Sequence, residues 1–218
     1  MTEDAAPRRR RAGGRRGHAD RAGHAAIDQM PWRLPVNPDR PTEPLRPEGV
    51  EAIHKGAMRI LSEIGIEFLN AEARDHLARA GCKVEGENVK MDADFVMEMV
   101  GRAPDRFSIT PRNPDRKLII GGNHIVFGNV SSPPNAWDMD RGKRSGDFET
   151  YKDFLKLTQY FNCIHFAGGY APEPVDVHAS VRHLECLYEK LTLTDKVAHA
   201  YSLGRERVED VMEMIRIA

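Results

Sequence analysis

Apolar residues recur every three to four positions in the stretch that follows Pro47. Because a proline suits the first turn of a helix and a glycine suits its end, Pro47 and Gly65 mark the two boundaries of this element. The apolar stripe consists of Val50, Ile53, Ala57, Ile60, Leu61 and Ile64. The spacing therefore predicts an amphipathic helix over residues 47–65.

Shorter elements follow this helix. Asn70 suits the cap of a second helix that runs to Gly81, and Asp92 suits the cap of a third. Residues 83–90, between them, have the pattern of a small hairpin. Nothing in this first helical region is typical of a catalytic motif.

The pattern changes to strands after Pro104. Three short runs with β-branched and aromatic residues are predicted as strands: 106–110, 117–120 and 124–127. The Gly-Gly-Asn sequence at 121–123 predicts a turn between the last two runs. A second turn-rich stretch covers residues 137–146.

From residue 149 onward, helical and strand patterns alternate. We expect helices over 149–161 and 177–191, strands over 163–168 and 196–202, and a last helix that begins at 205. Alternation of this kind implies parallel strands joined by right-handed crossovers. An open doubly wound sheet and a closed barrel both fit the pattern.

The last helix reaches Ala218 without a terminating glycine or proline. Two parallel strands also cannot form a sheet that is buried on both faces. We therefore expect either a partner that completes the sheet or a longer reading frame.

The whole chain has nearly equal numbers of basic and acidic residues, but the arginines are concentrated near its start. The 218 residues include 32 Lys and Arg against 33 Asp and Glu, with 40% hydrophobic residues, so a globular protein without a global preference for nucleic acid is expected. Residues 1–28 form an Arg- and Gly-rich tail that we predict to be disordered, and residues 29–46 form a proline-rich extended arm. Seven arginines lie between Arg8 and Arg21, so nonspecific nucleic-acid binding by the tail is an alternative function.

The three cysteines lie far apart and form no CxxC pair, which favours a reducing, cytoplasmic location. No apolar run approaches the roughly 20 residues that cross a bilayer, and no secretory signal begins the chain. We therefore predict a soluble protein without a membrane partner.

The ends of the two predicted parallel strands carry the strongest candidates for ligand contacts. Side chains alternate along a strand, so His165 faces one side, and His199 and Tyr201 share a face of the second strand. Ile164 and Phe166 are expected to pack against covering helices. Tyr170 follows the first strand and can offer its ring to a cation. Interior polar residues that only hydrogen-bond are the equally common alternative.

Glycine-containing loops follow two of the predicted strands. Gly128 and Asn129 come after the strand over 124–127, and Gly168 and Gly169 come after the strand over 163–168. Such glycines let a ligand approach the backbone, although ordinary loops use them as well. Neither loop has the GxGxxG or Walker pattern of a nucleotide site.

Other site chemistries have weaker support. Cys163 and His165 on a strand, with His183 and Cys186 on a helix, could each present metal ligands, but the two pairs are expected on opposite sides of the strand. Asp138 and Asp140 lie beside basic residues, as at a solvated hairpin tip, and Ser131, Ser132 and Ser202 lack the GxSxG elbow of hydrolases. We therefore predict no metal site and assign no catalytic nucleophile.

A series of short segments occurs in a characteristic order between residues 31 and 218. These segments are Pro31-Trp32, Ile53-His54, 59–67, 112–114, Gly121-Gly122, 126–128, 140–142, 168–170 and 191–196. By their order, and not by any single segment, the chain resembles the trimethylamine methyltransferase family.

The resemblance implies a (β/α)8 TIM-type barrel that transfers a methyl group from a methylated amine to the cobalt of a corrinoid on a separate protein. Because family members are longer, we expect residues 47–218 to be the amino-terminal portion of a barrel domain that begins with helices and a β-hairpin. Tyr170, His199 and Tyr201 would then contact the amine, and the loops at Gly128–Asn129 and Gly168–Gly169 would lie where the corrinoid approaches.

The amine is expected to be trimethylamine-like or quaternary, as glycine betaine is, because family members without pyrrolysine act on quaternary amines. A catalytically inactive fragment and an interaction module built on the arginine tail are the alternatives. A homo-oligomer also fits the pattern.

Overall fold

The computed structural model describes residues 27–201 and 203–218. The described residues divide into two compact units, one formed by those of 27–33 and 127–218 and the other by Leu34–Val126. The predicted disordered tail lies outside the described residues as far as residue 26. Among the described residues, no helix has both the length and the apolar character needed to cross a bilayer.

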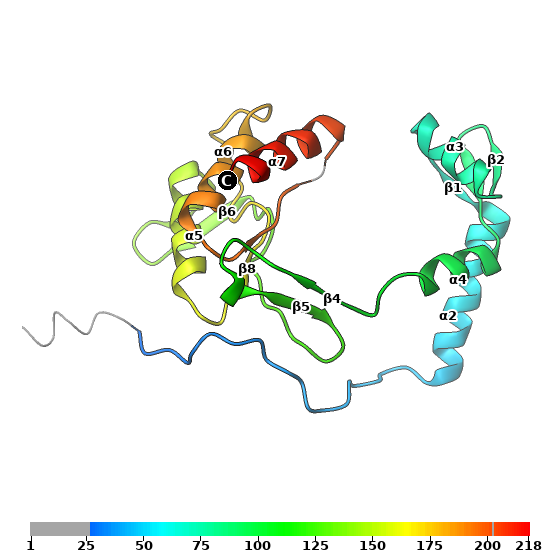
Figure 1. Cartoon of the computed structure of the whole chain (residues 1–218), viewed down its shortest axis with the longest axis horizontal. Helices are drawn as coiled ribbons and strands as arrows, with labels where there is room; N and C mark the ends of the chain where they lie inside the picture. Colours follow the sequence, from blue (N-terminus) through cyan, green and yellow to red (C-terminus); the bar gives the residue numbers. More distant parts are fainter. Residues whose placement is uncertain (1–26, 202) are drawn as a thin grey trace, which may run out of the picture. The chain divides into compact units, whose positions relative to one another are not determined.

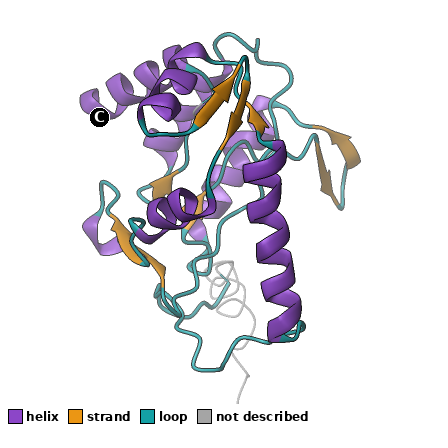
Figure 2. Cartoon of the chain, turned by 90° about the vertical axis from the view of Figure 1, so that its right-hand side faces the viewer, coloured by secondary structure: helices purple, strands orange, loops and turns teal. Residues whose placement is uncertain are grey.

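The unit Leu34–Val126 contains the predicted amphipathic helix. It comprises an α-helix, α2 (Pro47–Arg59), and a π-helical last turn, η1 (Ile60–Ile64). Gly65 ends it with a φ of 87°, and a side chain there would collide with the carbonyl of Val89. The helix leads into a small three-stranded sheet, and Figure 2 shows the long helix in side view.

The other predicted elements of this helical region are also present. Asn70 caps α3 (Ala71–Arg79) by accepting a 2.9 Å hydrogen bond from the amide of Ala73, and Asp92 caps α4 (Ala93–Gly101). The hairpin consists of β2 (Lys83–Glu85) and β3 (Asn88–Lys90), and β1 (Ile66–Glu67) pairs with β3 on its other side. The local signals in the sequence were therefore sufficient here.

The strand prediction for residues 106–127 is only partly confirmed. β4 (Arg106–Ile109) pairs antiparallel with β5 (Leu118–Gly121), with the short 3-10 turn η2 (Pro114–Arg116) between them. The predicted third strand, 124–127, is wrong. Its residues bond instead to the extended arm, where Ile125 donates to the carbonyl of Pro35 at 2.9 Å, and this pairing is too short to form a strand.

The other unit contains a hairpin formed by β6 (Asn135–Asp138) and β7 (Gly142–Ser145). Asp138 holds its tip by accepting hydrogen bonds from the backbone of Arg141 at 2.7 Å and from the side chain of Arg144 at 2.5 Å. The backbone of Arg141 holds the pKa of Asp138 below its ordinary value. This carboxylate thus fastens a turn, as the predicted hairpin tip required.

The predicted alternation of helices and parallel strands is confirmed in this unit. β8 (Phe166–Ala167) pairs parallel with β9 (Val197–Ala198), and both are shorter than predicted. The helices are α5 (Phe148–Tyr160), α6 (Arg182–Leu193) and α7 (Arg205–Ile217). The crossover helix α6 packs between α5 and α7 (Figure 1).

Helix α6 begins five residues later than predicted. The guanidinium of Arg182 donates to the carbonyl of Val177 at 2.9 Å and to Glu173 at 2.5 Å, which holds the preceding segment as a loop. The side chain that starts the helix therefore also fixes the loop before it.

The core of this unit lies behind β8. Tyr151, Leu155, Ala167 and Cys186 form a fully buried cluster between α5, α6 and the strand. The prediction that Phe166 packs against the covering helices is wrong. Ala167 faces them, because its small side chain admits both helices, while the ring of Phe166 fills the space beside Gly128.

His165 is a structural residue. It is buried, its Nε2 donates to the carbonyl of Arg33 at 2.9 Å, and its Nδ1 accepts from the amide of Phe127 at 2.9 Å. Trp32 packs edge-on against its ring. The imidazole thus fastens the first part of the extended arm to the residue before β8, which agrees with the interior polar alternative.

Candidate functional site

Three loops converge at the carboxyl ends of β8 and β9. The amide of Gly168 donates to Oδ1 of Asn129 at 2.6 Å, and the amide of Gly169 donates to Oγ of Ser131 at 2.7 Å. The amide of His199 bonds to the carbonyl of Ala167 at 2.9 Å and so adds the loop after β9. Residues that are about 40 positions apart in the sequence therefore form one cluster, which we call the strand-end site: residues 128–132, 168–170 and 199–201.

The predicted ligand-contact residues lie together in this site. The rings of Tyr170 and Tyr201 are in contact, with centroids 4.6 Å apart and planes inclined by 60°. The ring of His199 lies 5.6 Å from that of Tyr201. The two tyrosines are half-buried and His199 is exposed, so the three side chains form a partly open aromatic and polar surface.

Two serines of the site were missed as positioning residues, because the sequence was searched only for hydrolase nucleophiles. Ser132 donates its amide to the carbonyl of Tyr170 at 2.5 Å, and its hydroxyl hydrogen-bonds to the phenol of Tyr201. Its φ of 53° lies in the left-handed region, which costs a non-glycine residue on the order of 1 kcal/mol or more. Strain of this kind often accompanies functional loops, and here it aims one serine at both tyrosines.

The protein's own atoms fill the space beside the predicted loop glycines. A side chain at Gly169 would meet the phenol of Tyr201 and, at 2.5 Å, Oγ of Ser131. A side chain at Gly168 would meet the backbone of Asn129, and one at Gly128 would meet the ring of Phe166. These glycines therefore allow the three loops to pack closely.

We expect Gly169→Ala to displace the phenol of Tyr201 and to lower the free energy of unfolding by about 1–3 kcal/mol, as overpacking does. Urea unfolding followed by circular dichroism measures the change. Gly56→Ala is the matched control: the added methyl meets nothing within 4 Å inside α2, and it should stabilise the chain by up to about 1 kcal/mol. Equal stability of Gly169→Ala and the wild type would contradict this packing.

A buried lysine lies beneath the tyrosines. Lys190 of α6 is 2% exposed, and its ammonium donates to the carbonyls of Gly168 at 2.6 Å and His199 at 2.5 Å. The nitrogen lies 5.9 Å from the centre of the Tyr170 ring. Burial lowers the pKa of Lys190 to about 8. The only sequence signal was its position on the buried face of the helix, four residues after Cys186.

Two other titratable groups of the site have shifted pKa values. Burial, and then the charge of Lys190, lower the pKa of His199 below its ordinary value of 6.5. Burial raises the pKa of Tyr170 to about 12. Both shifts favour the uncharged form of the side chain, and an uncharged imidazole or phenol can orient a ligand through hydrogen bonds.

The interior behind this surface is nearly filled. A cavity of about 10 Å³ remains between α6, α7 and the loop after β9, which is roughly the room for one water molecule. Its lining residues are Tyr170, His183, Leu187, Lys190, His199, Ala200, Tyr201 and Val211. A ligand must therefore bind on the outer side of the tyrosine pair.

The four residues considered for zinc each have a separate environment. Cys163 is exposed, whereas Cys186 is buried, and burial raises the pKa of its thiol to about 12. Nε2 of His183 donates to Asp210 at 2.8 Å, and both ring nitrogens of His165 are bonded as described above. Over residues 27–201 and 203–218, no three His, Cys, Asp or Glu side chains gather as metal ligands would.

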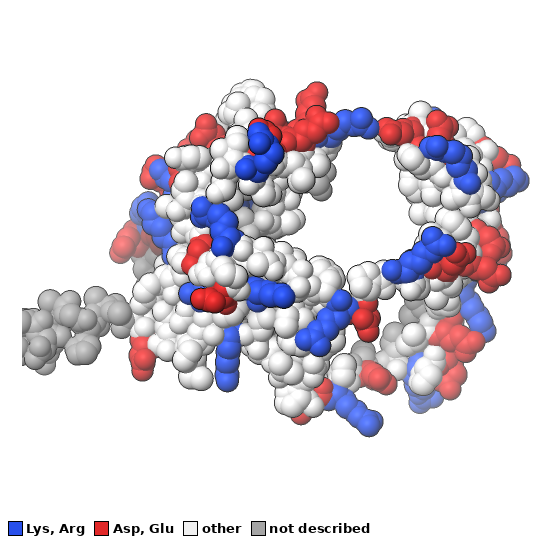
Figure 3. Space-filling model, viewed as in Figure 1, with Lys and Arg blue, Asp and Glu red and all other residues white. Residues whose placement is uncertain are grey.

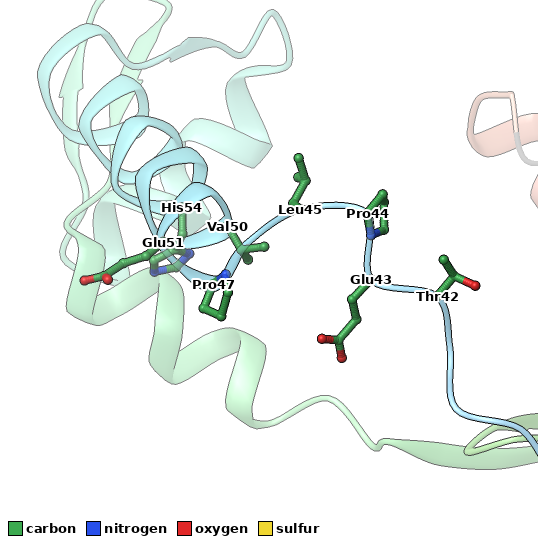
Figure 4. A pocket seen from close by; sticks show the side chains of 8 residues that line it. All are labelled: Thr42, Glu43, Pro44, Leu45, Pro47, Val50, Glu51 and His54. Carbon is green, nitrogen blue, oxygen red and sulfur yellow. The ribbon is translucent and has the colours of Figure 1, made fainter.

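A second hollow lies in the unit Leu34–Val126, where the arm meets α2. It measures about 650 Å³ and is lined by Thr42, Glu43, Pro44, Leu45, Pro47, Val50, Glu51 and His54 (Figure 4). Its polar side chains point in different directions, and Glu51 is paired with Lys55 at 2.7 Å. The strand-end site remains the better candidate, because its polar groups converge.

Charged side chains do not gather by sign on the face shown in Figure 3, where basic and acidic residues alternate over both units. Such a face has no basic stripe of the kind that follows a nucleic-acid backbone.

Known proteins similar to this chain are methyltransferases by name. The family described as Trimethylamine methyltransferase (MTTB) matches residues 10–218. Glycine betaine methyltransferase of Desulfitobacterium hafniense (strain Y51) is 36% identical over 173 residues, which are 79% of this chain and 36% of that protein. Proline betaine:corrinoid methyltransferase of Eubacterium limosum is 35% identical over 128 residues, 59% of this chain and 26% of that protein.

A third relative, Trimethylamine methyltransferase MttB of Desulfitobacterium hafniense (strain DSM 10664 / DCB-2), is 22% identical over 138 residues, 62% of this chain and 27% of that protein. The chain thus spans between 26% and 36% of the length of these curated relatives.

Proposed function

The chain belongs to the trimethylamine methyltransferase family, and we propose that it takes part in methyl transfer from a quaternary or methylated amine to a corrinoid carried by a separate protein. The observation that carries the proposal is the contact between Tyr170 and Tyr201 at the carboxyl ends of two parallel strands. In barrel enzymes, this end of the strands holds the active site. The names of the two relatives above 30% identity favour a betaine as the methyl donor.

The proposed fold is a (β/α)8 barrel in which β8 and β9 are neighbouring strands. The connection between them runs through α6, as a barrel requires. The loops at Gly128–Asn129 and Gly168–Gly169 would then border the opening through which the corrinoid approaches.

The side chains of the site suit a cationic methyl donor. A quaternary nitrogen is attracted to the faces of aromatic rings, and Tyr201 and the outer side of Tyr170 offer such faces. Lys190 lies on the inner side of Tyr170, so the donor would bind away from the ammonium. Burial lowers the pKa of His199, which favours a neutral imidazole that can orient the donor without repelling it.

The strand-end site would contribute to the reaction by positioning the methyl donor. The methyl group leaves as the electron pair of its bond returns to nitrogen, and the reduced cobalt of the corrinoid supplies the nucleophile. The residues of the strand-end site would hold the donor so that one methyl group faces the partner, which is a contribution of proximity and orientation.

The binding test uses the chain itself with glycine betaine, proline betaine and trimethylamine, observed by saturation-transfer NMR. We expect at least one donor to bind, and Tyr201→Leu to weaken that binding about tenfold, because a desolvated cation–π contact is lost. Tyr188→Leu is the matched control, since this tyrosine of α6 is 57% exposed and lies outside the site. The absence of binding by every donor would contradict the proposal.

The transfer test adds reduced cobalamin and follows the absorbance of methylcobalamin. Methyl transfer from the bound donor supports the proposal in full. Binding without transfer supports the alternative of a chain that holds the donor but is catalytically inactive. Binding of nucleic acid by residues 1–28 stays a prediction, since most of that tail lies outside the described residues.

A further inference from the structure

Lys190 occupies a special place relative to the two parallel strands. It projects from the crossover helix α6, and its ammonium bonds to the backbone just beyond the end of each strand, at Gly168 and His199. The last backbone hydrogen bond between the strands runs from the amide of His199 to the carbonyl of Ala167. The lysine thus joins β8 and β9 at the point where the backbone hydrogen bonds between these two strands stop.

The carbonyls that accept hydrogen bonds from Lys190 lie close to the two tyrosines in the sequence. Gly168 is two residues before Tyr170, and His199 is two residues before Tyr201. Two carbonyl oxygens that turn toward each other repel unless a donor lies between them, and a buried acceptor without a partner costs about 1–3 kcal/mol. Without the ammonium, the two loops are expected to separate and the tyrosine rings to lose contact.

A second buried lysine shows that this placement is not general to the fold. Lys196 is 3% exposed and donates to the carbonyls of Thr158, Phe161 and Ile164 at 2.5–2.8 Å. These carbonyls lie before β8, at the opposite end of the strands from the tyrosines. The two lysines make the same kind of contact, but only Lys190 does so at the site.

We infer that Lys190 is a positioning residue of the strand-end site, which holds Tyr170 and Tyr201 in contact through the carbonyls of Gly168 and His199. It acts through the backbone and does not touch the donor, because the tyrosine rings lie between them. The inference rests on the proposed function only for what the tyrosine pair binds.

The test compares Lys190→Met with Lys196→Met, which each remove one buried ammonium and leave similar volume. Tyrosine labelled with ¹³C at Cζ reports on the five tyrosines of the chain. At a temperature where circular dichroism shows both variants folded, we expect Lys190→Met to shift the signals of Tyr170 and Tyr201 and to weaken glycine betaine binding about tenfold. Lys196→Met should lower the unfolding temperature but leave both signals and the affinity within about twofold of the wild type.

Unchanged signals of Tyr170 and Tyr201 in Lys190→Met would overturn the inference, and so would an equal shift in Lys196→Met. If Lys190→Met does not fold, Lys190→Arg replaces it: the larger head group should push the two carbonyls apart and shift both signals, and unchanged signals would again overturn the inference. If the wild type binds no donor, the proposed function fails while the tyrosine signals still decide the role of Lys190.

Discussion

Leu155→Ala is expected to lower the free energy of unfolding by about 2–5 kcal/mol. Leu155 is 1% exposed and lies on α5 in the buried cluster with Tyr151, Ala167 and Cys186. Removing most of its side chain leaves a cavity between two helices and a strand, and packed secondary structure collapses only partly into such a cavity. Urea unfolding followed by circular dichroism measures the change.

Leu157→Ala is the matched control, because Leu157 lies on the same helix but is 45% exposed. It removes the same atoms from a position that water already reaches, so we expect a cost below about 1 kcal/mol. Equal costs for the two variants would show that the cluster behind β8 is not the core of this unit. Because Tyr170 packs against the same cluster, Leu155→Ala should also weaken donor binding.

The helices of the unit Leu34–Val126 could be predicted because their signals are local, whereas the start of α6 was placed five residues too early. The side chains of Asn70 and Asp92 accept hydrogen bonds from amides two or three residues away. The apolar residues after Pro47 recur about once per helical turn. The third strand over 124–127 failed for the opposite reason. Its partner is the extended arm, which lies about 90 residues earlier and has no strand pattern of its own.

The candidate site was predictable in part, because parallel strands place their carboxyl ends at one edge of a sheet. That rule brings Tyr170, His199 and Tyr201 together without knowledge of any contact. Ser132 could not be found in this way. Its role depends on a backbone with positive φ and on hydrogen bonds to residues 38 and 69 positions later, which no local pattern encodes.

Lys190 shows a further limit of sequence reasoning. A lysine on an apolar helix face is usually assumed to extend to solvent, because burying an ammonium is costly. Here two carbonyls at the strand ends offset part of that cost, and the side chain stays inside. Only the placement of β8 and β9 reveals that the acceptors exist.

The remaining cost of burying this charge should be visible as a dependence of stability on pH. The pKa of Lys190 is lowered by burial to about 8 from an ordinary value of 10.5. Between these two values, the unfolded chain binds more protons at this lysine than the folded chain, so the free energy of unfolding rises with pH. Below about pH 8 the ammonium is charged in both states, and the stabilisation present above pH 10.5 has been lost.

We therefore expect the wild type to gain about 2.5 kcal/mol relative to Lys190→Met when the pH rises from about 7 to about 10. Urea unfolding of both proteins at several pH values measures this difference. The groups that face the ammonium are the Cys186 thiol, the Tyr170 phenol and the His199 imidazole, and in the folded chain the first two have pKa values raised to about 12, while that of His199 is lowered from 6.5. None of them titrates in the folded state between pH 8 and 10, and their contributions cancel in the comparison. A difference between the two proteins that stays constant over this range would show that folding does not lower the pKa of Lys190, and so that its charge carries no uncompensated cost of burial.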